Sequence, residues 1–175
     1  MNYSNNGNGQ TNYTWLVPDN ATNTTRIRII DSKDTSVYAE SSGNFSLIGS
    51  FNIVSPNGGE SWIVDSYRNI TWVPTGSSIT EARIMYSING SDGPWINITE
   101  DYGTPNDGIV ANNGTFVWKV PDSISQNVYI KIEDPLDPTV NDTSNESFTI
   151  RGNFSILSPA GGERWVTNEA NHTIN

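Results

Sequence analysis

The chain of 175 residues contains no cysteine and a single histidine, His172. Missing thiols exclude disulfides and Cys/His nucleophilic pairs, and one histidine cannot build a His-rich metal site. A secreted animal domain often carries a disulfide, so this absence fits a cytosolic protein or a prokaryotic surface protein held together by packing. No Gly-X-Ser-X-Gly nucleophile elbow occurs either. We therefore predict that the chain is not an enzyme, and we assign it no catalytic, cofactor-binding or metal-binding residue.

Basic residues are scarce, and long apolar runs are missing. Nine Lys and Arg stand against 19 Asp and Glu, for a net charge of −10. Without a basic stripe, a nucleic-acid partner is disfavoured. No apolar stretch is long enough to span a membrane, and the first residues do not form a signal peptide. The acidic surplus suits a crowded, soluble surface.

What the chain does have is an internal repeat. Residues Phe51–Trp62 (FNIVSPNGGESW) return 103 positions later as Phe154–Trp165 (FSILSPAGGERW). The same shift carries Trp15–Asp19 (WLVPD) onto Trp118–Asp122 (WKVPD) without a gap. A fixed period indicates an array of one structural unit. We predict the later part of one unit in residues 1–50, a complete unit in 51–153 and the start of a third in 154–175, and we interpret the chain as a section of a longer array.

Apolar and polar residues alternate in short runs along the complete unit, which is typical of half-buried strands separated by turns. About seven such runs in about 100 residues favour an all-β fold of tandem immunoglobulin-like antiparallel β-sandwiches. The alternation places Trp72, Trp118 and the equivalent Trp15 toward a core. It places Trp95 toward solvent, opposite in phase to Ile96.

Asparagine-linked glycosylation signals are far more numerous than chance predicts, and none has proline at its centre. Such a density indicates passage through a glycosylating, extracellular route. The sites are not in register between repeats, which favours a coat that covers surface over one specific glycan ligand. The 13 candidate sites are Asn2, Asn12, Asn20, Asn23, Asn44, Asn69, Asn89, Asn97, Asn113, Asn141, Asn145, Asn153 and Asn171.

Several of these runs resemble one family. Ser-Pro-X-Gly-Gly-Glu-X-Trp, followed by Asn69–Trp72 (NITW), Trp118–Pro121 (WKVP) and a final Phe148–Ile150 (FTI), is similar to the Ser/Thr-rich, immunoglobulin-like repeat named after a yeast cell-wall assembly protein (KNH-like). Similar repeats occur in tandem in archaeal and bacterial surface proteins. The resemblance implies a secreted sandwich with a role at the cell surface or wall. With the sequon density, it points to an archaeal source.

Two recurrent motifs invite a binding role. The pairs Asp31/Asp34 and Asp134/Asp137 occupy one repeat position, where oxygen-rich turns could hold Ca²⁺. Their spacing matches no calcium loop, so we favour Asx-type turns that cap strand ends, and we expect no cofactor beyond covalent N-glycans. The Gly-Gly-Glu60 turn predicts positive φ at its glycines and a glutamate that accepts backbone N–H bonds or meets the neighbouring unit.

The preferred function is a non-enzymatic, heavily N-glycosylated structural protein, extracellular at the cell surface, as a stalk, sheath or filament. Its partners would be further repeats, copies of itself, or wall or extracellular polysaccharide. The alternatives are an adhesin or carbohydrate-binding module, with Trp95 as a stacking platform, and a spacer attached to a distant enzyme domain. An exposed aromatic cluster would favour the adhesin.

Overall fold

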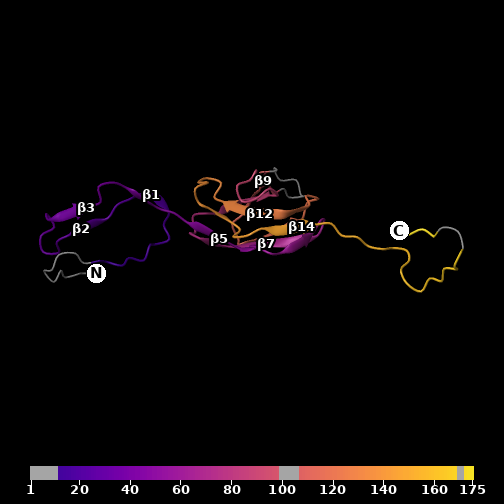
Figure 1. Cartoon of the computed structure of the whole chain (residues 1–175). Coiled ribbons are helices and arrows are strands. Elements are labelled where there is room, and N and C mark those ends of the chain that lie inside the picture. Colours follow the sequence, from indigo (N-terminus) through magenta and orange to yellow (C-terminus); the bar gives the residue numbers. More distant parts are fainter. Residues whose placement is uncertain (1–11, 99–106, 169–171) are drawn as a thin grey trace.

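The computed structural model describes residues 12–98, 107–168 and 172–175. These residues form strands and no helix, as the alternation predicted (Figure 1). The all-β class is therefore confirmed. The strands are β1 (Thr22–Thr25), β2 (Arg28–Ile30), β3 (Tyr38–Glu40), β4 (Phe45–Leu47), β5 (Ser50–Ser55), β6 (Ser61–Ile63), β7 (Tyr67–Thr75), β8 (Glu81–Ser87), β9 (Ile96–Asn97), β10 (Ile109–Ala111), β11 (Thr115–Lys119), β12 (Ser125–Glu133), β13 (Asn141–Thr143) and β14 (Phe148–Arg151).

Three parts follow one another along the molecule. The N-terminal segment, residues 12–49, holds β1 to β4. The central body, residues 50–153, holds the remaining strands. The C-terminal segment, from residue 154 onward, leaves the body at the end opposite to the N-terminal segment (Figure 1). The described residues of this last part contain no strand.

Two sheets enclose the core of the central body. One sheet has the strand order β10-β8-β12-β14-β6, with β13 paired to β12 and β9 paired to β8. The other has the order β11-β7-β5. All pairs are antiparallel except β14 with β6, which is parallel. Buried side chains from both sheets form one cluster, so the body is a sandwich-like arrangement around a single core.

The chain changes sheets between β5 and β6. A bulge interrupts the pairing of β5 with β7 between Ile53 and Ser55. The cis peptide bond Ser55–Pro56 and the glycines Gly58 (φ 133°) and Gly59 (φ 80°) follow at once. Only glycine adopts such φ values without strain, so this turn lets β6 cross to the edge of the opposite sheet. The positive φ expected at these glycines is confirmed.

The alternation predicted from the sequence gives most of the core. Trp118 packs against Trp62, with ring centroids 6.0 Å apart, and against Tyr86 at 5.2 Å. Trp62 also lies 4.9 Å from Phe148. The fully buried aliphatic side chains are those of Ile53, Ile70, Ile84, Val120, Val128, Ile130, Ile132 and Ile150. Some residues on the opposite faces of these strands, such as Val73 and Val117, are exposed to solvent.

The region around β9 departs from the predicted alternation. Trp95 is half-buried and Ile96 is 43% exposed, which reverses the expected phase. β9 begins only at Ile96, so Trp95 precedes the strand and strand alternation does not apply to it. Its ring lies 6.0 Å from the Lys131 Nζ. Lys131 pairs with Met85 across the sheet, and Met85 is buried on the same outer face.

The N-terminal segment repeats the pairings of the central body. β1 pairs with β4 through Thr22–Leu47 and Thr25–Phe45, with an irregularity between the two pairs. β12 pairs with β14 through Ser125–Ile150 and Val128–Phe148, each position 103 residues later, with the same irregularity. β2 with β3 likewise matches β12 with β13, position for position. The sequence repeat is therefore also a repeat of strand register.

Candidate functional site

No group of three or more His, Cys, Asp or Glu side chains that could hold a metal ion occurs in the described ranges. His172 stacks on Trp165, with parallel rings whose centroids lie 4.4 Å apart. Within the described residues, no helix is long and apolar enough to cross a bilayer. The features that remain as candidates are the recurrent turns, the sequons, the surroundings of Trp95 and the contact between the two strand-bearing parts.

Glu60 closes the Gly-Gly-Glu turn on itself. Its carboxylate accepts the N–H of Asn57 at 2.8 Å and that of Gly58 at 2.9 Å. The equivalent Glu163 accepts the N–H of Ala160 at 2.6 Å and that of Gly161 at 2.7 Å. These bonds, that from Ala160 above all, lower the pKa of Glu163 because they stabilise its charged form. The glutamate thus acts as the internal acceptor that the sequence predicted.

The recurrent aspartates also accept bonds from their own turns. Asp34 Oδ1 accepts the N–H of Ser36 at 3.0 Å and its hydroxyl at 2.6 Å. Asp137 Oδ1 accepts the N–H of Thr139 at 3.1 Å and its hydroxyl at 2.6 Å. The Ser36 hydroxyl and then its N–H lower the pKa of Asp34. Asp31 and Asp134 each accept the N–H two residues on. All four are Asx-type turns, the structure that the sequence favoured at these positions.

One carboxylate, that of Glu133, is buried at the end of β12. Glu133 is 6% exposed, and it lies between Arg83 Nη1 at 2.9 Å and Lys131 Nζ at 3.0 Å. Arg83 and Glu133 are paired residues of neighbouring strands. This ion pair network joins β8 to β12 and explains the burial of Glu133 without a catalytic role. The only sequence signal for this network is the opposite charge of Arg83 and Glu133. That signal can be recognised only once β8 and β12 are known to be neighbours.

The candidate glycosylation sites lie mostly on the surface. Asn97, in β9, is half-buried. Asn2 and Asn171 lie outside the described residues. An oligosaccharide needs an accessible side-chain nitrogen, and the exposed sites meet this requirement. These exposed sites are Asn12, Asn20, Asn23, Asn44, Asn69, Asn89, Asn113, Asn141, Asn145 and Asn153.

Local hydrogen bonds distinguish some sequons from others. The Asn141 Nδ2, the atom that would carry a glycan, donates to the carbonyl oxygen of Pro138 at 2.9 Å. Among the described residues, the side chains of Asn44 and Asn113 form hydrogen bonds only through Oδ1, which accepts from Arg26 Nε at 2.7 Å and from the Thr115 N–H at 3.1 Å, respectively. A glycan at Asn44 or Asn113 therefore leaves the existing bond in place, whereas one at Asn141 competes with it.

The surface near Trp95 offers little platform for a carbohydrate ring. Trp95 is half-buried, with Lys131 near its ring. A surface depression of about 260 Å³ close by is lined by Tyr86, Ile96 and Asn97, among others. Asn97, which carries a sequon, is therefore one of the residues that line this depression. Trp95 is thus only partly exposed, and the described residues near it include no cluster of exposed aromatic rings.

The N-terminal segment contacts the central body at what we call the joint. Asp19 Oδ1 accepts the backbone N–H of Ser77 at 2.9 Å. Gly49 is buried, and a Cβ at that position would lie 2.5 Å from the Thr75 carbonyl oxygen and 2.4 Å from Ile79 Cδ1. Only glycine allows this approach. Sequence reasoning missed the joint, although the recurrence of Asp19 as Asp122 and of Gly49 as Gly152 was a signal for it.

Comparison of the chain with known protein families and with curated proteins finds no match in either.

Proposed function

We propose that the chain belongs to a non-enzymatic, N-glycosylated structural protein of the cell surface, in which immunoglobulin-like units repeat in tandem as a stalk, sheath or filament. The observation that carries the proposal is the recurrence, 103 residues apart, of strand register as well as sequence. Repeated units in series suit a protein that spans distance or presents surface. They do not by themselves converge on a single reaction centre.

The organisation of the central body supports an immunoglobulin-like unit. Two sheets share one core, and the chain passes from one sheet to the other between β5 and β6. The length of the repeat is also that of an immunoglobulin-type domain, about 100 residues. The core is made without disulfides, by packing of Trp62, Trp118 and Phe148 with the surrounding aliphatic side chains.

The surface supports an extracellular setting. Ten of the sequon asparagines are exposed, and they are spread over both the N-terminal segment and the central body. The net charge of −10 adds repulsion between neighbouring copies in a crowded layer. The two carboxylates described above have structural partners. Glu133 pairs with Arg83 and Lys131, and Glu60 accepts an N–H bond from its own turn. Further units of the same kind, and surface polysaccharide, are the partners that this arrangement suits.

Analysis of the protein isolated from its natural source tests the proposal. Glycopeptide mass spectrometry should find glycans on exposed sequons such as Asn69, Asn113 and Asn145, and electron microscopy should show an elongated particle or filament. An intact mass equal to that of the bare polypeptide would contradict the proposal that this is an extracellular glycoprotein. A compact particle in the micrographs would contradict the proposal of a tandem array.

A further inference from the structure

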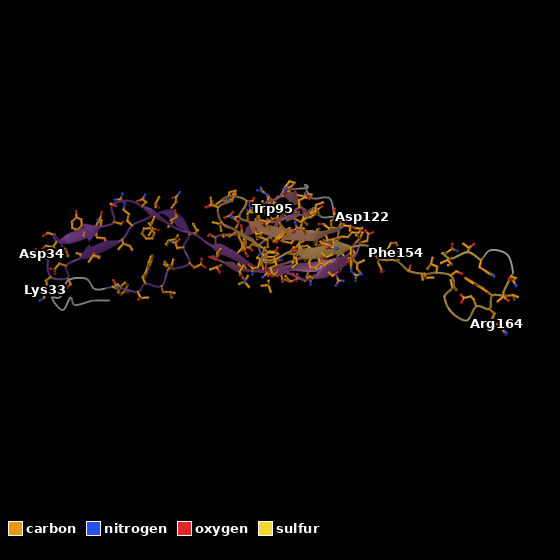
Figure 2. All side chains as sticks on the ribbon, in the orientation of Figure 1. Lys33, Asp34, Trp95, Asp122, Phe154 and Arg164 are labelled. Carbon is orange, nitrogen blue, oxygen red and sulfur yellow. The ribbon has the colours of Figure 1, made fainter. Side chains whose placement is uncertain are left out.

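Both residues of the joint have an equivalent at the other end of the central body. Asp19 corresponds to Asp122, and Gly49 corresponds to Gly152. The turn around each aspartate is the same, since the N–H of Asn20 donates to the Pro18 carbonyl at 2.9 Å and that of Ser123 to the Pro121 carbonyl at 2.8 Å. Figure 2 shows Asp122 at the end of the body from which the chain continues to Phe154.

The second pair differs from the first in lacking a contact. Asp122 is exposed, and its carboxylate accepts no hydrogen bond from the described residues, whereas Asp19 accepts one from Ser77. A Cβ added at Gly152 would meet nothing closer than Ile124 Cδ1 at 3.6 Å, an ordinary contact. Glycine at 152 therefore has no steric cause within the described part of the central body. It has one if a neighbouring unit approaches as closely as Thr75 approaches Gly49.

We propose that Asp122 and Gly152 form a docking surface for a following unit of the same kind. The Asp122 carboxylate accepts the N–H at the position of that unit equivalent to Ser77, and Gly152 leaves room for the carbonyl and aliphatic side chain equivalent to Thr75 and Ile79. The occupant is indicated by the joint itself, where the same two residue types already hold such a turn. The inference rests on the proposed function, because it requires units in series.

Docking of this kind fixes orientation as well as contact. A carboxylate bonded to a backbone N–H and a glycine packed against backbone atoms leave less freedom than a peptide linker alone. Each added unit should then keep the same angle to the one before it. The array becomes a semi-rigid rod with a regular twist, and not a string of freely jointed bodies.

A chain in which the central unit occurs twice tests the proposal. Residues 1–153 are followed by a second copy of residues 51–175, which preserves the spacing because Phe51 and Phe154 are equivalent positions. The absence of cysteine allows a spin label at Val117→Cys in each copy, on an exposed position of β11. Double electron–electron resonance then measures the distance between the two bodies. A single narrow distribution is expected, and a broad one overturns the docking.

Two substitutions in the first copy sharpen the test. Gly152→Ala and Asp122→Ala should leave the urea melt of the original chain unchanged, because neither side chain position makes a close contact within its described residues, yet each should abolish the narrow distribution in the doubled chain. Gly43→Ala is the matched control, since nothing lies within 4 Å of a Cβ at that position. A narrow distribution kept in both variants overturns the proposal. If the doubled chain or its variants contradict the docking, the glycoprotein proposal still stands, because that proposal is tested on protein from the natural source.

Discussion

The N-terminal segment and the later half of the central body have the same strand pairings but opposite burial. Trp15 is 41% exposed where the equivalent Trp118 is 3% exposed. Ile27 is 47% exposed where Ile130 is fully buried. The register of β1 with β4 nevertheless matches that of β12 with β14. Strand pairing is therefore determined by nearby sequence, whereas burial depends on strands that the rest of a unit must supply.

Local interactions account for the shared part of this comparison. The Asp34 turn and the Asp137 turn make the same three bonds, two from the following serine or threonine and one from the valine three residues on. Such turns fix the offset of the two strands they connect, whether or not a core forms beneath them. Burial comes instead from the facing sheet, because β5 and β7 lie opposite β12 and β14, and β8 lies opposite β11. The described N-terminal segment has no such strands over it.

The largest expected effect comes from emptying the buried member of an equivalent pair. Trp118→Ala removes a ring packed on Trp62 and Tyr86, and should destabilise the central body by roughly 3–5 kcal/mol. Trp15→Ala changes the equivalent but exposed position and should leave the melt of the body unchanged. Urea unfolding followed by circular dichroism measures both. Equal losses would mean that Trp15 belongs to the same cooperative core.

The features of the fold that could be predicted from the sequence are those that depend on residues close together in the chain. Two-residue alternation and turn residues gave the all-β class, the core positions around Trp118 and the bonding of Glu60, because each depends on residues close in the chain. The repeat gave the equivalences between strands. Neither could place Trp95, because it precedes β9 and its surroundings are set by Lys131, on a different strand.

Contacts between distant residues escaped prediction for the same reason. Met85 lies on the outer face of its sheet, opposite Lys131, yet it is buried there, close to Trp95 and Lys131. The Asp19–Ser77 bond joins residues 58 positions apart, and no local pattern specifies such a pairing. The Arg83–Glu133 pair could be read only once β8 and β12 were known to be neighbours.

The second prediction uses the glycine turns that occur in both the body and the C-terminal segment. Gly58 has φ 133°, and a Cβ there would lie 2.6 Å from the Cβ of Glu146. Gly58→Ala should therefore cost roughly 2–4 kcal/mol, from backbone strain and overpacking together. Gly161, in the C-terminal segment, has φ 112°, and no atom lies within 4 Å of the point that a Cβ would occupy, so Gly161→Ala is the control that leaves the body unchanged. Thermal melts of the body should shift for the first variant only.

A smaller effect is expected from the glutamate of the same turn. Glu60→Gln replaces a charged acceptor of two N–H bonds by a neutral amide, which should destabilise the central body by about 1 kcal/mol. Glu163→Gln removes the equivalent charge outside the body and should leave its urea midpoint unchanged. If the two variants shift that midpoint equally, the C-terminal segment and the body unfold as one unit, and the division drawn above is wrong.

The smallest effect is a local titration that tests whether a turn forms without a core around it. The N–H bonds from Ala160 and Gly161 lower the pKa of Glu163, so the carboxylate should titrate below the usual range of a glutamate. A pKa lowered by folding stabilises the turn above the unfolded pKa, and this stabilisation is lost as the pH falls through the folded pKa. In an NMR titration, the amide signals of Ala160 and Gly161 should move with the same midpoint as the Glu163 carboxyl carbon. In Glu163→Gln those amide signals should no longer follow this midpoint. A Glu163 that titrates as an ordinary glutamate would show that the turn needs a body around it, and local sequence would then determine less of the repeat than strand register suggests.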